Sequence, residues 1–553
     1  MDHGPATHQS AETSRSATAF PEATTGISRL PGKTAAASHH RGRPSRLRIP
    51  AGWPLVAILV GQALLSLRLV RADTAFEDEA AYLWAGHLEW AHVLHGTPLP
   101  SFPAYFSGAP VIYPPLGALA DSVGGLTGAR ILSLVFMLGV TVVLWSITTR
   151  LHGQRAAFFA AALFAVLGPT LHLGSFATYD AMALLLLTLA VWFVVHAGDR
   201  QDATVWMLAA GVTLVAANAT AYTTTLFDPV VVLVALAVAF PKPGGKLALA
   251  RALVLFVIVS LLLTLGLLAG GSSYIHGFTA TTLGRVDGTD TIQAVLSQAW
   301  SWTGVIVVIA ICGAAASWVL MPRRPQTWLL TMLAAAALLV PLEQASLHTT
   351  ASLNKHVDIG AWFAAIAAGY AVDKFIRAAP AGNMRAITCG ACVVALSFPA
   401  SIGTGQSRTF STGWPDSTAF VGVLRPLVDQ GTGHLLVEDP TLAEYYLHVG
   451  SSWTRWSSTR NIFLPSGTAT GGPSDKAGIV GAGNAGTFAL YIQQGYFSLI
   501  ALSFSDTVSL DKALAADIRR NHHYVKIEII PYGNGPAGPA LGTYSIWRYE
   551  PQK

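Results

Sequence analysis

Long apolar segments separated by short polar connections dominate the chain between about residue 53 and residue 401. Segments of roughly 16 to 24 apolar residues are long enough to cross a bilayer as helices. We predict about eleven, at 53–71, 129–148, 155–172, 180–197, 204–222, 226–240, 248–270, 303–321, 326–342, 358–376 and 384–401. The boundary between the fifth and sixth is the least defined, because Asn218 and a short hinge interrupt the hydrophobicity. The pattern predicts a polytopic α-helical membrane protein.

Composition supports a membrane protein. Of the 553 residues, 52% are hydrophobic and only 11% are charged, whereas a soluble protein of this length needs more charge to cover its surface. The net charge of +5 is small for the size, and its distribution does not indicate nucleic-acid binding. Two of the three cysteines, Cys389 and Cys392, form a CxxC, but its apolar flanks favour packing over a redox or metal site.

Basic residues predict the orientation. If the N-terminus is cytoplasmic, alternate connections should carry Lys and Arg. These connections hold Arg150, Arg155, Arg200, Lys242, Lys246, Arg251, Arg323, Arg324, Lys374, Arg377 and Arg385. The opposite connections hold mainly Arg71, Arg130, Arg285 and Lys355. We therefore expect a multi-pass cell-membrane protein with its N-terminus in the cytoplasm and its C-terminal segment outside.

The two ends of the chain differ from the spans. Residues 1–50 are rich in Ser, Thr, Ala, Gly and His and predict a disordered cytoplasmic tail. The first apolar run is too long for a cleavable signal peptide, so we expect a retained anchor at the start of a transmembrane domain over 51–401. Sequences typical of strands and helices then alternate, which predicts an extracytoplasmic α/β domain over 402–553. Its Gly- and Ser-rich stretch at 465–486 predicts a long loop and lacks the ending of a phosphate-binding loop.

The first predicted outer loop, 72–128, contains the sequence FEDEAAYLWAGH at 76–87. Three consecutive acids in this sequence stand just after the first apolar run. From Ala80 onward, apolar residues recur at helical spacing, which predicts an amphipathic helix at the membrane interface. In such a helix, Asp78 and Tyr82 share a face.

Other predicted outer connections also carry charged side chains. Asp180 stands at the mouth of the fourth span, Lys355 and His356 precede the tenth, and Arg285 lies in a further loop. Each has an ordinary structural explanation, such as a helix cap, a solvated loop charge or a structural ion pair. Their joint placement on one side of the membrane favours a shared site.

These sequences resemble a family. DEAAY at 78–82, in a long first outer loop, is similar to the start of the GT-C superfamily of polytopic glycosyltransferases. The most similar branch is family 39-like and includes protein O-mannosyltransferases and aminoarabinose transferases. YPPLGAL at 113–119 resembles that branch's proline-containing loop, and TYDAMAL at 178–184 resembles its second acidic motif. The resemblance covers roughly residues 50–400, and it departs from some members in having no carboxylate in VIYPP at 111–115.

The resemblance implies a membrane glycosyltransferase that moves a sugar from a polyprenyl-phosphate donor to an acceptor hydroxyl on the extracytoplasmic face. Asp78 matches the family's catalytic Asp and would act as the general base, with Glu79 as a second catalytic candidate beside it. Attack opposite the leaving phosphate implies inversion at the anomeric carbon.

The remaining candidates would bind substrates. They are Tyr82, Tyr113, Asp180, Arg285, Lys355 and His356. The cations among them would stabilise the leaving phosphate, and the others would orient the acceptor or the base. As partners we expect the bilayer, the lipid-linked donor and an acceptor protein, lipid or polysaccharide. We assign no cofactor and no metal site, and we leave the question of a divalent metal open.

Two other functions fit parts of the pattern. A transporter or lipid flippase would place charged residues at mid-span and break its helices with Gly or Pro in matching halves. Here most span centres are Ala, Leu and Val, and the polar clusters lie at the outer ends. A non-catalytic scaffold could bind a glycan through Trp453 and Trp456 of the outer domain, although packing is the better explanation of these side chains.

Overall fold

The computed structural model describes residues 52–551 with gaps. The gaps are 105, 199, 201–202, 241–243, 430–432, 449–451, 461–484 and 534–539. The tail predicted at 1–50 and most of the loop predicted at 465–486 lie outside the described residues.

Among the described residues, nine helical segments are long and apolar enough to cross a membrane. They are α3 (Tyr113–His152), α6 (Tyr179–Ala197), α7 (Ala203–Thr220), η2 (Tyr222–Phe227) with α8 (Asp228–Ala239), α9 (Gly245–Gly270), α11 (Ile292–Leu320), α12 (Pro325–Ala335) with η3 (Ala336–Leu338) and α13 (Leu339–Ser346), α14 (Leu353–Ala378), and α15 (Asn383–Ala395) with α16 (Ser397–Phe410). These segments confirm the prediction of a polytopic helical membrane protein.

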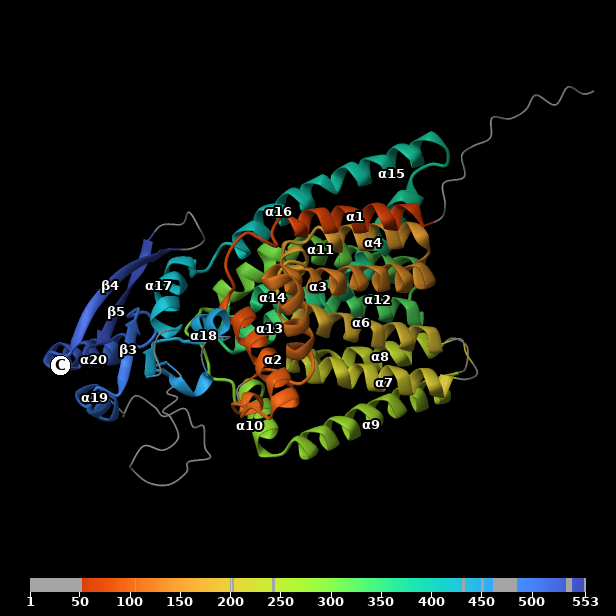
Figure 1. Ribbon diagram of the computed structural model, residues 1–553. Helices are drawn as coiled ribbons and strands as arrows, with labels where there is room; N and C mark the ends of the chain where they lie inside the picture. The colour runs from red at the N-terminus through yellow and green to blue at the C-terminus, as the bar shows by residue number, and fades with distance from the viewer. Residues whose placement is uncertain are drawn as a thin grey trace, which may run out of the picture. The chain divides into compact units, whose positions relative to one another are not determined.

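Two of the predicted spans are shorter than expected. The runs at 53–71 and 155–172 form α1 (Trp53–Leu67) and α4 (Gln154–Ala165), and α4 is followed by the short α5 (Gly168–Leu173). Both α1 and α4 lie alongside the long helices (Figure 1).

The most deeply buried of these segments is α14, which packs against α4, α11 and α12. Its Trp362 and Phe363 are fully inaccessible to solvent. Small residues allow this packing because they let neighbouring backbones approach closely. At Gly369, for example, a Cβ atom would lie 2.3 Å from the carbonyl oxygen of Ala156.

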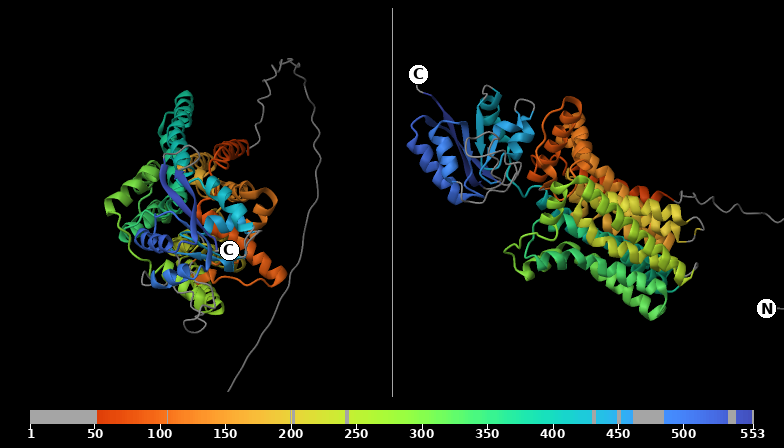
Figure 2. Two further views of the ribbon diagram at one scale, coloured as in Figure 1. Left: turned by 60° about the vertical axis from the view of Figure 1, so that its left-hand side comes forward. Right: turned by 90° about the horizontal axis from the view of Figure 1, so that it is seen from below.

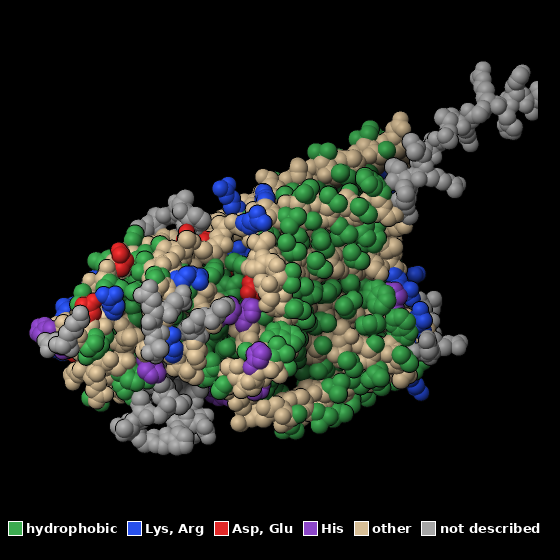
Figure 3. All heavy atoms as spheres, viewed as in Figure 1, with side chains coloured by type: hydrophobic (Ala, Val, Ile, Leu, Met, Phe, Trp, Pro, Cys, Tyr) green, Lys and Arg blue, Asp and Glu red, His purple; other side chains and the backbone are tan. Residues whose placement is uncertain are grey.

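Figure 3 shows hydrophobic side chains over the sides of the helical part and charged side chains toward its ends.

The C-terminal domain is built on a five-stranded sheet with strand order β2-β1-β3-β5-β4. Its strands are β1 (His434–Val437), β2 (Trp456–Ser458), β3 (Phe497–Leu502), β4 (Tyr524–Gly533) and β5 (Ala540–Tyr549). β1 pairs in parallel with β2 and β3, whereas β5 pairs antiparallel with β3 and β4. One face carries α17 (Thr418–Asp429) and α18 (Thr441–Leu447), and the other carries α19 (Ala485–Gln493) and α20 (Val508–Arg520) (Figures 1 and 2).

This sheet confirms the predicted α/β domain, and several details are new. The sequence did not indicate β2, α17 or α19, and α16 extends the helical part to Phe410. Trp456 lies in β2 and is 4% exposed, while the indole of Trp453 donates a hydrogen bond to the carbonyl oxygen of Pro98. The burial of Trp456 and the hydrogen bond of Trp453 favour packing over glycan binding for these two side chains.

The first outer loop folds into α2 (Glu77–His95), η1 (Phe102–Ala104) and the start of α3. α3 kinks at Gly125, whose φ of 61° suits glycine, and the span predicted at 129–148 follows the kink. α2 is the predicted interfacial helix, which buries Leu83 and exposes Val93. It packs against α3 and against α18 of the C-terminal domain. Its place at the outer leaflet remains a prediction.

Candidate active site

The three acids of the opening motif occupy the first turn of α2, where the helix dipole favours negative charge. Because successive residues of a helix point about 100° apart, the three carboxylates reach different partners. Asp78 points toward α14, and its Oδ2 lies 2.6 Å from Nζ of Lys355. The side chain of Asp78 is 34% exposed, whereas that of Lys355 is only 6% exposed. Asp78 is therefore a partly open carboxylate paired with a buried cation.

Asp180 completes the cluster from the first turn of α6. Its Oδ2 lies 3.8 Å from Nζ of Lys355, and its Oδ1 lies 3.7 Å from Nε2 of His356. The hydroxyl of Thr178 donates a hydrogen bond to Asp180 at 2.7 Å. The predicted residues Asp78, Asp180, Lys355 and His356 thus meet at one end of the helical part.

Gln344 contacts the other side of the His356 ring. The amide nitrogen of Gln344 lies 3.1 Å from Nδ1 of His356. The imidazole is thus held between the Gln344 amide at Nδ1 and the Asp180 carboxylate at Nε2. Sequence reasoning missed Gln344, which lies on α13 just after the span predicted at 326–342.

Aromatic side chains pack beneath the charged cluster. The ring centroid of Tyr82 lies 4.5 Å from that of Tyr179 and 5.1 Å from that of Phe106. Burial, together with Tyr179 and Asp78, raises the pKa of Tyr82 well above its usual value, so its phenol stays protonated at neutral pH. Tyr113, at the start of α3, is fully buried in the same cluster. These tyrosines can donate hydrogen bonds or pack, and they cannot serve as bases near neutral pH.

Glu79 has different surroundings from Asp78. It is fully buried, and its two oxygens accept hydrogen bonds from Nε and a terminal nitrogen of Arg130 at 2.8 and 2.6 Å. The backbone N–H groups of Phe76 and Ala177 donate to the same carboxylate. Arg130 also donates to the carbonyl oxygens of three residues before α2, namely Val70, Asp73 and Thr74. Glu79 and Arg130 therefore connect α2, α3 and the chain entering α6.

Sequence reasoning assigned Arg130 no role beyond the count of basic residues. A signal was available, because a lone arginine at the start of an apolar run is rare unless it is paired. The remaining candidate, Arg285, lies outside the cluster. It is only partly buried, and its guanidinium reaches the carbonyl oxygen of Ala351 at 3.5 Å, just before α14.

The C-terminal domain adds contacts beside Asp78. Arg460 lies 2.6 Å from Glu77 and 2.8 Å from Asp439. A second contact joins the hydroxyl of Tyr445 on α18 to Asp121 on α3 at 2.7 Å. No sequence pattern indicated that this domain touches the first turn of α2.

The charged cluster can perform acid–base chemistry on a group that carries an anion. A partly exposed carboxylate can accept a proton, and the buried ammonium and imidazole groups can face a phosphate. Among the described residues, no group of three or more His, Cys, Asp or Glu side chains is arranged to hold a metal ion.

Comparison by sequence gives a partial match. The family model described as dolichyl-phosphate-mannose-protein mannosyltransferase matches residues 118–262. A comparison with curated protein sequences finds no significant match.

Comparison by structure covers most of the chain. The fold is similar to that of ArnT from Cupriavidus metallidurans bound to undecaprenyl phosphate, with a TM-score of 0.58 and 14% identity over 91% of this chain and 100% of that chain. It is also similar to the apo oligosaccharyltransferase of Archaeoglobus fulgidus, with a TM-score of 0.53 and 14% identity over 89% of this chain and 74% of that chain. The archaeal oligosaccharyltransferase AglB from Archaeoglobus fulgidus, in complex with an inhibitory peptide and a dolichol-phosphate, gives a TM-score of 0.51 and 12% identity over 88% of this chain and 74% of that chain. These matches confirm the resemblance noted in the sequence, and the chain has the fold of the GT-C superfamily of membrane glycosyltransferases.

Proposed function

We propose that this protein is a membrane glycosyltransferase that moves a sugar from a polyprenyl-phosphate donor to an acceptor hydroxyl. The GT-C fold and the partial match to a mannosyltransferase family support the class of enzyme. Two of the similar structures carry undecaprenyl phosphate or a dolichol-phosphate, which supports a polyprenyl-phosphate donor. The acceptor is a hydroxyl of a protein, a lipid or a polysaccharide.

One observation carries the proposal. Three charged side chains come from helices that are far apart in the sequence: Asp78 from α2, Asp180 from α6 and Lys355 from α14. Even so, the ammonium nitrogen of Lys355 lies within 3.8 Å of a carboxylate oxygen of each aspartate. The arrangement places a candidate base, Asp78, directly beside a cation, Lys355, that can bind a phosphate. A base for the acceptor hydroxyl and a cation for the leaving phosphate are both needed in such a transfer.

In the proposed reaction, Asp78 is the general base. It accepts the proton of the acceptor hydroxyl while that oxygen forms a bond to the anomeric carbon of the sugar. The bond between the anomeric carbon and the phosphate oxygen breaks, and the electron pair leaves with the polyprenyl phosphate. Attack from the face opposite the phosphate inverts the anomeric configuration.

Cations assist the departure of the phosphate. Lys355 binds the phosphate oxygens as negative charge develops on them, and the N–H of His356 donates to the same group or to Asp180. Arg285 is placed near the start of α14, where it can meet the phosphate from the solvent side. Tyr82, Tyr113 and Asp180 shape and orient the pocket around the acceptor and the base.

Glu79 has a positioning role in this proposal. Its carboxylate is committed to Arg130 and to two backbone N–H groups, so it is not available to take a proton from an acceptor. The buried pair sets the direction of the first turn of α2 and therefore the place of Asp78.

We also propose that the site faces the extracytoplasmic side of the cell membrane, with the N-terminus in the cytoplasm. The supporting observation is the distribution of basic residues, which concentrate at the end of the helical part that lies opposite Asp78. A lipid-linked donor then presents its phosphosugar at headgroup depth, beside α2.

The test uses purified full-length protein in lipid nanodiscs. The protein is incubated with a panel of polyprenyl-phosphate sugars and hydroxyl acceptors, and release of free polyprenyl phosphate is measured by mass spectrometry. Removal of a general base typically lowers the rate by a factor of about 10² to 10⁴, so Asp78→Asn should lose turnover to that extent while it still binds polyprenyl phosphate.

The matched control is Asp287→Asn, which makes the same substitution at an exposed position of an outer loop. It should keep the turnover of the unaltered protein. Turnover in Asp78→Asn equal to that of the control would reject the assigned base. Absence of release from every donor by folded protein, with movement of the lipid between leaflets, would instead support a flippase.

A further inference from the structure

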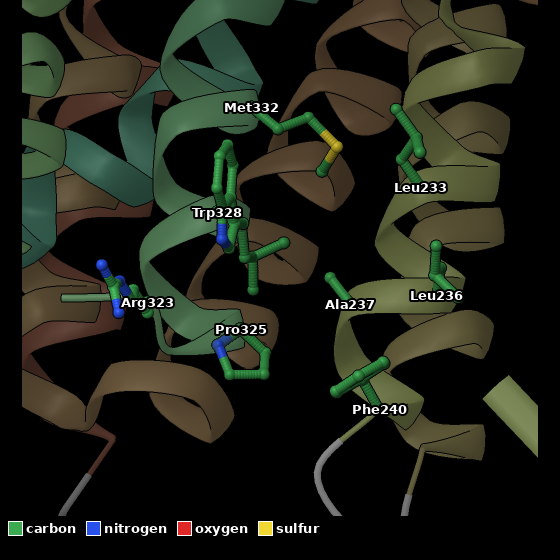
Figure 4. A pocket seen from close by; sticks show the side chains of 9 residues that line it. Leu233, Leu236, Ala237, Phe240, Arg323, Pro325, Trp328 and Met332 are labelled. Carbon is green, nitrogen blue, oxygen red and sulfur yellow. The ribbon is translucent and has the colours of Figure 1, made fainter. Parts of the chain in front are cut away.

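A groove between α8 and α12 lies at the end of the helical part opposite the candidate active site. It has a volume of about 400 Å³. Leu233 and Met332 line one end, and Phe240 and Pro325 line the other (Figure 4). Both flanking helices belong to segments that are long and apolar enough to cross a membrane. The groove therefore borders the bilayer rather than water along most of its length.

The groove combines apolar, aromatic and charged side chains. Leu233 on α8 and Phe240 just after it are seven positions apart, as are Pro325 and Met332 on α12, which corresponds to about 10 Å along each helix. Phe240 and Trp328 are 50% and 59% exposed, as is usual for aromatic side chains at a membrane interface. Arg323, in the connection before α12, also lines the groove. These side chains suit the three parts of a phospholipid, namely the acyl chain, the interfacial region and the phosphate.

The mouth of the groove carries positive charge, and no acidic side chain among the described lining residues balances it. Arg323 is exposed and is the one charged residue among the described residues that line the groove. Its backbone has a φ of 61°, which is uncommon for a residue with a side chain and costs conformational energy. Lys246 is exposed at the same end and adds to the positive potential. Clusters of basic residues at this depth attract anionic lipids.

We propose that this groove is a binding site for an anionic phospholipid of the bilayer. One acyl chain lies between α8 and α12, and the phosphate group contacts Arg323. The site is separate from the donor site, because it lies at the other end of the spans.

Lipid titration tests the proposal. Delipidated full-length protein in detergent is titrated with phosphatidylglycerol or with phosphatidylcholine of the same acyl chains, and bound lipid is counted by native mass spectrometry. Phosphatidylglycerol should bind more tightly. Arg323→Gln should weaken the binding of phosphatidylglycerol by roughly fivefold, which is the effect of about one interfacial cation. It should leave the binding of phosphatidylcholine unchanged. The matched control is Arg324→Gln, which removes the adjacent exposed arginine that does not line the groove.

Filling the groove provides the second arm. Ala237→Trp, with the milder Ala237→Leu, should lower occupancy by both lipids, because the added side chain occupies the space of the acyl chain. Equal losses in Arg323→Gln and Arg324→Gln would show diffuse surface attraction and would overturn the site. Unchanged phosphatidylglycerol binding in both Ala237 variants would equally reject it. Thermal unfolding of each variant checks that it is folded.

Discussion

At the scale of single residues, Lys355 occupies the most informative position. Its ammonium group lies 2.6 Å from Asp78 and 3.8 Å from Asp180, and the side chain is almost completely buried. In the proposed reaction, a donor phosphate competes with Asp78 for this ammonium group. Binding of the phosphate then releases the Asp78 carboxylate to accept a proton. One lysine thus links recognition of the donor to activation of the acceptor.

Replacing Lys355 tests its role in donor binding. Lys355→Gln should weaken binding of polyprenyl phosphate by roughly tenfold to a hundredfold, since a hydrogen bond to a charged group contributes about 1.5–3 kcal/mol. Affinity is measured by titrating polyprenyl phosphate, without sugar, into protein in nanodiscs. Lys512→Gln, at an exposed position on α20, is the matched control. Unaltered affinity in folded Lys355→Gln would remove this lysine from the donor site.

Glu79 gives a second residue-scale prediction, which concerns stability. Glu79→Gln should lower the free energy of unfolding by about 3–5 kcal/mol, because it leaves the buried Arg130 guanidinium without its counter-ion. A double-mutant cycle with Arg130→Gln, followed by thermal or denaturant unfolding, isolates the contribution of the pair. A stable but inactive Glu79→Gln protein would contradict the positioning role and would favour direct contact with substrate.

At the scale of elements, the start of α2 is held from two sides. From within the helical part, Glu79 binds Arg130 of α3. From the C-terminal domain, Arg460 binds Glu77, and it also contacts Asp439 and Asp506 of its own domain. Asp78 lies between these two anchors in the sequence. The direction of its side chain therefore depends on both domains.

Loss of the outer anchor should loosen this turn. Arg460→Gln should increase hydrogen exchange of the backbone amides at the start of α2 and lower kcat several-fold, because Asp78 is held less precisely. The affinity for polyprenyl phosphate should stay the same, since Lys355 is untouched. Arg520→Gln is the control, because Arg520 is exposed and pairs with Asp517 inside α20. If exchange rates at α2 are the same in both variants, the domain does not brace the site.

Some contacts of this site could be predicted from the sequence and others could not, for physical reasons. The sequence could predict that Asp78, Asp180 and Lys355 lie close together, because the length of the spans places their loops on one side of the membrane. The sequence could indicate that Arg130 needs a partner, but it could not identify Glu79 as that partner, because the side chains of Glu79 and Asp78 differ in direction by one step of a helix. The contact of Arg460 with Glu77 spans 383 residues and depends on how the sheet domain packs. Hydrophobic length predicts spans well, but it carries no information about such long-range pairs.

At the scale of the whole molecule, the two ends of the helical part differ in charge. The candidate active site and the C-terminal domain lie at one end, and connections rich in Arg and Lys lie at the other. From the positive-inside rule we expect the basic end to lie in the cytoplasm. Donor recognition and the proposed phospholipid groove would then belong to opposite leaflets.

Labelling of single cysteines tests this orientation. In a background with Cys312, Cys389 and Cys392 replaced by Ala, cysteine is introduced by Asp287→Cys near the site or by Lys246→Cys at the basic end, both at exposed positions. A membrane-impermeant maleimide should label the first variant in intact cells. It should label the second variant only after the cells are permeabilised. We expect this order because translocating the basic connections is unfavourable, which would keep them in the cytoplasm and leave the end that carries Asp78 facing outward. Labelling in the reverse order would place the carboxylates on the cytoplasmic side, and the proposed donor would then have to be presented from the inner leaflet.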